Sequence, residues 1–183
     1  MKRNARPSLF DLVAFDDPLD MLLACHRKIE KQLETLKRLR VHLATHGVDP
    51  EASAAAQALL RYFDKAATNH NEDEEQDLFP LLEQRITDAG EFARFRDFRA
   101  EIERDHREIE AKWARMRRPL EGIAEGLTRG LLADDVLGFV GAYARHIRVE
   151  ETALVEFFNR WLNDDDRRAL GQSMSARRHN DNR

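Results

Sequence analysis

Cysteine is nearly absent from this chain: Cys25 is the only one among 183 residues. A single cysteine excludes an internal disulfide and any metal site built from several thiolates. Helix-breaking residues are also scarce, with five prolines and eight glycines. This composition, with 35% charged and 42% hydrophobic residues, predicts a helical globular protein that does not depend on an oxidising compartment.

Long apolar runs and a strong charge of one sign are missing as well. No stretch approaches the roughly 20 apolar residues of a membrane-spanning helix. The short run 9–15 is interrupted by Asp11 and is unlike a secretory signal. The formal net charge of −4 favours neither nucleic acid nor a membrane as a partner. We therefore expect a cytoplasmic protein.

Apolar residues instead recur at intervals of three and four, which predicts amphipathic helices over 18–46, 50–86, 92–120 and 133–161. Asp-Pro pairs open the first two segments, as an N-cap followed by proline at the first helical position. Four such helices with short links predict an all-α, up-down-up-down four-helix bundle. We expect a leader over 1–16, the bundle over 17–162, and a short helix with a polar tail over 163–183.

Several details of these segments are also predicted. Pro80 should disturb the last turns of the second helix, because it lacks the backbone N–H. The glycine-containing stretch 122–130 should be a loop. The short last helix should reach Met174, and the basic residues of the C-terminal region should lie on a solvated face; these are Arg167, Arg168, Arg177 and Arg178.

Two helices carry the same motif, His-x-x-x-Glu-Glu-x-x-Leu, beginning at His70 and at His146. Residues four apart share one face of a helix, so each motif presents an imidazole and a carboxylate together. A second repeat, His-Arg-x-Ile-Glu, begins at His26 and at His106 in the other two helices. The chain therefore resembles two similar helical hairpins.

The loops place the four histidines at one height. In an antiparallel hairpin, residues equidistant from the turn lie side by side. Position 48 is midway between His26 and His70, position 88 between His70 and His106, and position 126 between His106 and His146. All three positions fall in predicted loops. One layer of the core should then hold six polar side chains: His26, His70, Glu74, His106, His146 and Glu150.

Burying four imidazoles and two carboxylates without compensation is very unfavourable. A pair of divalent metal ions would compensate them, each taking two histidines and one oxygen from each bridging glutamate, with room for an oxo or hydroxo bridge. Imidazole and carboxylate ligands suit iron, manganese or zinc. A single buried histidine is more often a hydrogen-bonded core residue, so a metal-free bundle with a structural polar layer remains the alternative.

The six residues, with Leu78-Phe79-Pro80 following the second motif, resemble the hemerythrin family, specifically its HHE cation-binding domain, over 17–162. The resemblance implies a non-haem centre of two iron ions that binds a small molecule such as O2, NO or peroxide. Oxygen carriers of the family have a histidine where this chain has Glu110 and an aspartate where it has Glu151. The resemblance is closer to the histidine-plus-glutamate variants, which implies sensing, scavenging or iron handling, or alternatively a stress enzyme or iron–sulfur repair factor.

Residues beside the layer receive weaker predictions, and no catalytic residue is assigned. Glu30 and Glu110 are expected to be flanking charges, with a hydrogen bond to a ligand histidine or a role as an extra metal ligand as the alternatives. Glu75 and Glu151 are expected at the surface or behind the ligands. Cys25 and Tyr143 are expected to be packing residues, and three histidines have no predicted metal role: His42, His46 and His179.

Overall fold

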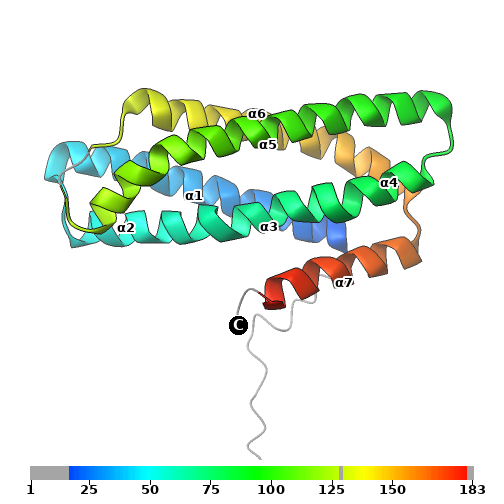
Figure 1. Cartoon of the computed structure of the whole chain (residues 1–183), viewed down its shortest axis with the longest axis horizontal. Helices are drawn as coiled ribbons and strands as arrows, with labels where there is room; N and C mark the ends of the chain where they lie inside the picture. The colour runs from blue at the N-terminus through cyan, green and yellow to red at the C-terminus, as the bar shows by residue number, and fades with distance from the viewer. Residues whose placement is uncertain (1–16, 128–129, 181–183) are drawn as a thin grey trace, which may run out of the picture.

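The computed structural model describes residues 17–127 and 130–180, and these residues are helical apart from short connections (Figure 1). The predicted leader over 1–16 lies outside them. The elements in chain order are α1 (Pro18–His46), α2 (Pro50–Arg61), η1 (Tyr62–Ala66), α3 (Ala67–Glu72), η2 (Asp73–Leu78), α4 (Phe79–Arg85), α5 (Ala89–Ala124), α6 (Ala133–Trp161) and α7 (Asp164–Asn180).

Four long rods form the bundle, because the elements from α2 to α4 follow one another as a single rod. In Figure 1 the rods run alternately in opposite directions. Helix α1 packs against α2 and α6, and α5 packs against the same two helices, so the rods close into a ring. This confirms the predicted all-α bundle. Helix α7 then turns back and lies against α1 and η2.

Aspartates begin three of the rods, as side-chain caps that accept backbone N–H groups. The Oδ1 atoms of Asp17, Asp49 and Asp88 accept from the N–H groups of the residues two or three positions later. Gly47 ends α1 with φ of +73°, a conformation that glycine adopts without a steric penalty. These local signals fix the turns, and the turns fix which residues of neighbouring rods lie at the same height.

The second rod is not a regular α-helix as predicted, because it contains two π-helical stretches, η1 and η2. In each, the last backbone bond spans five residues: Ala67 donates to the carbonyl of Tyr62, and Phe79 donates to that of Glu74. Pro80 follows directly, in the first turn of α4. The disturbance expected from proline thus lies just before it, as a widened turn that contains Glu74.

Helix α5 is longer than predicted. It continues through Pro119 and Gly122 to Ala124, and Gly122 is buried. The prediction of a loop from position 122 was therefore wrong by one turn, because the helix packs against its neighbours there and this contact outweighs the low helix propensity of glycine.

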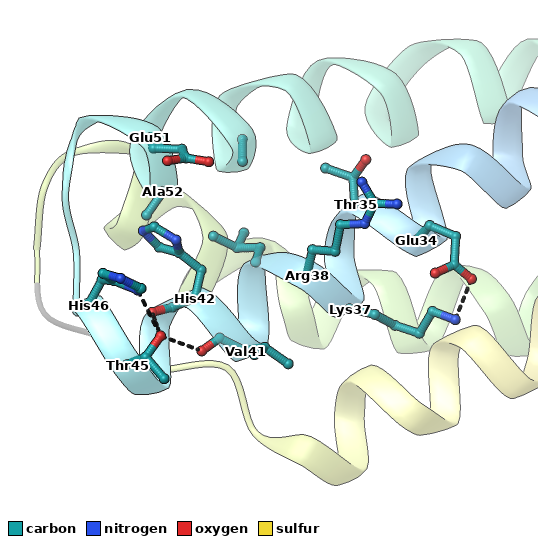
Figure 2. Close-up of a pocket in the computed structure, with 12 residues that line it drawn as sticks. Glu34, Thr35, Lys37, Arg38, Val41, His42, Thr45, His46, Glu51 and Ala52 are labelled. Atoms are coloured by element: carbon teal, nitrogen blue, oxygen red, sulfur yellow. Dashed lines mark hydrogen bonds and ion pairs between the residues drawn. The ribbon is translucent and has the colours of Figure 1, made fainter.

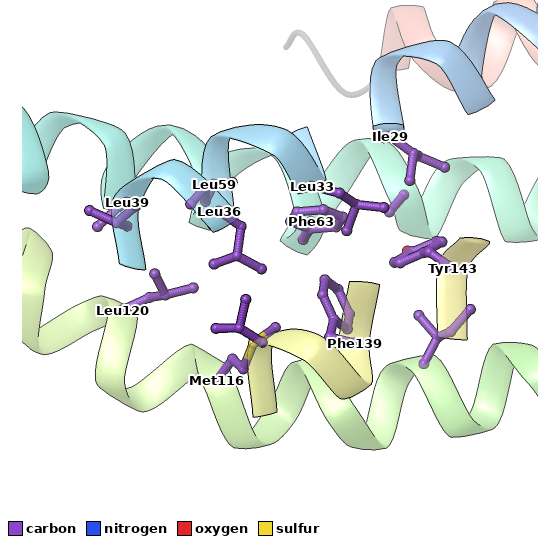
Figure 3. Close-up of a cluster of buried hydrophobic side chains, with 14 of the residues drawn as sticks. Ile29, Leu33, Leu36, Leu39, Leu59, Phe63, Met116, Leu120, Phe139 and Tyr143 are labelled. Atoms are coloured by element: carbon purple, nitrogen blue, oxygen red, sulfur yellow. The ribbon is translucent and has the colours of Figure 1, made fainter. Parts of the chain in front are cut away.

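The core consists of two apolar clusters, one on each side of the predicted polar layer. The first contains Phe63, Phe139 and Tyr143 among leucines and isoleucines (Figure 3). The second contains Phe79, Phe95, Phe98, Phe157 and Phe158. On α1 the first cluster begins at Ile29 and the second ends at Leu22, so His26 lies between them.

The C-terminal region differs most from prediction. Helix α7 extends to Asn180, well past Met174. Arg177 and Arg178 do not face solvent freely, because both form ion pairs with the fully buried carboxylate of Asp73 in η2. Arg167 likewise reaches Asp17, 3.2 Å away. The predicted solvated face was wrong for these three arginines; Arg168 remains exposed, and its one ion pair among the described residues is with Asp165.

Candidate metal centre

All six predicted residues lie in one buried layer at the middle of the bundle. None of the six is more than 2% exposed to solvent. The layer receives side chains from four rods: His26 from α1, His70 from α3, Glu74 from η2, His106 from α5, and His146 and Glu150 from α6. The antiparallel register inferred from the loop positions therefore places these side chains correctly. Their role as metal ligands stays a prediction.

One group of potential ligands contains His26, His70, Glu74 and Glu150. The Nε2 atoms of His26 and His70 lie 3.1 Å apart. His26 Nε2 is also 3.1 Å from Glu150 Oε2, and His70 Nε2 is 3.0 Å from Glu74 Oε1. Two nitrogens and two carboxylate oxygens thus converge on one point.

A second group contains Glu74, His106 and His146. His106 Nε2 lies 3.2 Å from Glu74 Oε2, the oxygen that does not face His70. His146 Nε2 lies 3.2 Å from Glu150 Oε2. Glu74 therefore presents one oxygen to each group, which is the arrangement of a bridging carboxylate between two ions. Glu150 contacts a histidine of each group through the same oxygen, Oε2.

The unsatisfied polar atoms of the layer fit a metal pair. Both oxygens of Glu74 and the Nε2 atoms of His106 and His146 are buried without a hydrogen-bond partner among the described residues. Such orphaned atoms are rare in native proteins and call for an explanation such as an ion. Ligand atoms about 2.1 Å from one ion lie roughly 3 Å apart when they subtend a right angle at it, and this is the spacing observed.

Electrostatics within the layer also favour cations. Burial raises the pKa of Glu150, but His26 and His146 outweigh burial and hold it well below its usual value. Burial lowers the pKa of His70, but the Glu74 carboxylate outweighs this and raises it well above the ordinary value. The carboxylates are therefore ionised and need positive charge beside them, which protons on histidine or metal ions can supply.

Two glutamates outside the layer fix the orientation of its histidines. Glu151 Oε1 lies 3.0 Å from Nδ1 of His26, and Glu75 Oε1 lies 2.6 Å from Nδ1 of His106. Each bond leaves Nε2 directed into the layer, as carboxylates behind metal-binding histidines commonly do. Of the two locations predicted for Glu75 and Glu151, the structure shows the one behind the histidines.

Glu30 and Glu110 are exposed and form no hydrogen bond or ion pair with the layer among the described residues. Tyr143 is buried in the first apolar cluster, with its ring centroid 6.3 Å from that of His146. It also lines a cavity of about 80 Å³ together with Glu110 and Trp113. The prediction of Tyr143 as a core residue is confirmed.

The sequence analysis missed the buried carboxylate of Asp73, which directly precedes Glu74. Its Oδ2 accepts from Arg178 at 2.6 Å, and Arg177 pairs with it and with Asp77. Burial raises the pKa of Asp73, while the two guanidinium groups act in the opposite direction. The available signal in the sequence was the adjacent pair Arg177 and Arg178. Only the docking of α7 against η2 shows that their partner is Asp73.

The remaining histidines lie apart from the layer. His42 and His46 stack with ring centroids 4.6 Å apart at the end of α1, beside an open groove of about 710 Å³ (Figure 2). His42 pairs with Asp49 at 2.9 Å. His179 is exposed near the end of α7.

The core of this four-helix bundle contains two facing groups of histidine and carboxylate side chains. This combination of fold and site is typical of proteins that bind cations inside a helical core. The hemerythrin HHE cation-binding domain matches residues 17–158, and the chain belongs to this family. An uncharacterized protein of Haemophilus influenzae is 30% identical over 164 residues, covering 90% of this chain and 91% of that protein.

The described helices do not include a candidate membrane span, since none combines sufficient length with sufficient apolar character. The family and the two ligand groups together support cation binding inside the bundle.

Proposed function

We propose that the buried layer binds two iron ions and that the protein senses or scavenges a small molecule, O2, NO or peroxide, in the cytoplasm. The observation that carries this proposal is the convergence of four histidine Nε2 atoms on two carboxylates, three of whose four oxygens lack a hydrogen-bond partner among the described residues. The residues fit iron because imidazole and carboxylate ligands suit it, and the family binds cations. Manganese and zinc are the alternatives that metal analysis would distinguish.

Each residue of the layer has a role in this proposal. His26 and His70 would hold one ion, and His106 and His146 the other. Glu74 and Glu150 would bridge the two ions, since each contacts a histidine of both groups. The bound iron would supply redox chemistry toward the small molecule, while the apolar clusters on both sides keep water away from the layer.

The position of Glu110 favours sensing or scavenging over oxygen carriage. Oxygen carriers of the hemerythrin family have a histidine at this position. In this chain the position is Glu110, which is exposed and is not part of the layer. The second ion would therefore have fewer protein ligands than in a carrier.

Metal analysis of the purified full-length protein tests the ligand set. We expect about two iron ions per chain, as in other two-metal sites, and strongly reduced iron in His70→Ala and Glu150→Ala. Glu110→Ala removes an exposed glutamate one turn from His106 and should retain the wild-type content. Full metal content in both layer variants would show that the ligand set is wrong.

Spectroscopy and turnover then test the small-molecule role. Visible absorption of the iron-loaded protein should change on addition of azide or nitric oxide if the centre has an open position. Sustained consumption of peroxide or nitric oxide would identify an enzyme, whereas stoichiometric binding would identify a sensor. A spectrum insensitive to all of these molecules would contradict the proposal.

A further inference from the structure

An open groove of about 590 Å³ lies on the outside of the bundle where α1, the α2–η1 junction and α7 meet. Its lining is rich in cationic side chains from all three regions and includes no carboxylate among the described residues: Lys28, Arg61, Lys65 and Arg178. This is unusual in a chain with a net charge of −4.

The charges of the groove are only partly balanced. Arg178 pairs with Asp73, and Lys65 also has a partner. Lys28 and Arg61 are exposed, and neither forms an ion pair with any other described residue. Lys28 and Arg61 are therefore the two cations of the groove that an anion could neutralise.

The other large groove, shown in Figure 2, does not share this character. It combines Lys37 and Arg38 with Glu34 and Glu51, and Lys37 pairs with Glu34. Its charges therefore largely cancel. The concentration of positive charge therefore distinguishes the groove beside α7 from the groove in Figure 2.

The cationic groove lies next to the polar layer, on the outer side of α1 and α3. Cys25 and Asn69 line it, and they directly precede His26 and His70 in the chain. An occupant of the groove would therefore lie against the backbone that carries two of the proposed ligands.

We propose that this groove binds a small organic anion bearing a phosphate or carboxylate group. Its volume lies within the range of about 300–1,000 Å³ found for small-molecule sites and exceeds what a single inorganic ion fills. Arginine and lysine supply the charge-assisted bonds that such groups prefer, and Tyr62 and Gln32 also line the groove.

Alkylation of Cys25 gives a direct measure of occupancy, because it is the only cysteine of the chain and lines the groove. We expect AMP or succinate, added to the full-length protein as purified, to slow its reaction with neutral iodoacetamide in a saturable way. Chloride at equal ionic strength should not. AMP and succinate distinguish a phosphate from a carboxylate ligand.

The matched variants are Lys28→Glu/Arg61→Glu in the groove and Arg115→Glu/Arg118→Glu on α5, which make the same change of charge at exposed sites outside it. Apparent affinity for the protecting anion should fall by at least about tenfold in the first, since each charge-assisted bond contributes that much or more, and remain unchanged in the second. Equal protection by chloride, equal effects in both variants, or no protection by either anion would overturn the proposal.

This site does not depend on the identity of the metal. Protection of Cys25 can be measured in iron-loaded and metal-depleted protein, so failure of the anion site and failure of the di-iron proposal give separate results.

Discussion

At the scale of single residues, Glu75 and Glu151 fix the orientation of two histidine rings in the layer, those of His106 and His26. Both bond to the Nδ1 atom of a layer histidine. We predict that Glu151→Ala and Glu75→Ala each weaken metal binding by roughly 10–100-fold, the usual cost of losing such a partner. Metal-affinity titration of the purified variants measures this.

Glu30→Ala and Glu110→Ala are the controls for this prediction. Both glutamates lie one turn from a layer histidine but are exposed. If these controls lose as much affinity as Glu75→Ala and Glu151→Ala, the histidines are not oriented by the bonds that the structure shows.

The titration of the layer sets the pH dependence of metal uptake. Burial lowers the pKa values of His26 and His106, but the nearby glutamates outweigh it and raise both. A histidine must lose its proton to bind a metal ion. We therefore predict that apparent affinity falls as the pH is lowered from about 8 to 6, through a range that extends above the ordinary histidine value of about 6.5.

Proton release is the matching measurement. Calorimetry of metal binding at pH 7 in buffers of different ionisation enthalpy should show net release of protons by the wild-type protein. Binding without proton release would mean that the layer histidines are already neutral in the metal-free protein.

At the scale of elements, α7 is held to the second rod by the buried Asp73. The double variant Arg177→Ala/Arg178→Ala leaves this carboxylate without its two main counter-charges. Because breaking a buried ion pair from one side is costly, we predict a loss on the order of 3 kcal/mol in the free energy of unfolding. Chemical denaturation measures it.

Adding Asp73→Asn to that double variant should restore part of the lost stability, because the unpaired buried charge is removed. The measured quantity is the non-additive part of the change in the free energy of unfolding when Asp73→Asn is combined with the two arginine substitutions. Additive effects of the three substitutions would show that α7 docks without the ion pairs to Asp73.

The helices and the layer were accessible from sequence because their signals are local. Apolar spacing predicts each helix, and the turns near Gly47 and Asp88 fix the height of His26, His70 and His106. The π-helical turns were not accessible, since their altered hydrogen bonds depend on packing in the folded bundle.

The docking of α7 was not accessible either. Its three aspartates are followed by two pairs of arginines, and the helix has no strong apolar stripe, so the local pattern resembles a solvated helix. Their partner, Asp73, lies about 100 residues earlier. A contact of this kind is determined by tertiary structure alone.

At the scale of the whole molecule, the polar layer separates two apolar clusters that are each well packed. We predict that chelation of the metal lowers the thermal midpoint while helical circular dichroism persists at low temperature, because both clusters remain. Adding metal should restore the free energy of unfolding, by about 1.4 kcal/mol for each tenfold by which the free metal concentration exceeds the dissociation constant.

Glu150→Ala is the control for metal removal, since its midpoint should respond little to metal. A wild-type midpoint that is the same with and without metal would contradict the role of the layer as a binding site and favour a purely structural one.

Glu151 bonds to His26 and Glu75 bonds to His106, so one histidine of each group has a carboxylate behind it. The two groups are otherwise unequal, because Glu74 presents a different oxygen to each group, whereas Glu150 contacts His26 and His146 through the same oxygen. Their surroundings differ as well, since Cys25 lies beside His70 and Tyr143 lies beside His146. Two ions bound as proposed would therefore have unequal environments.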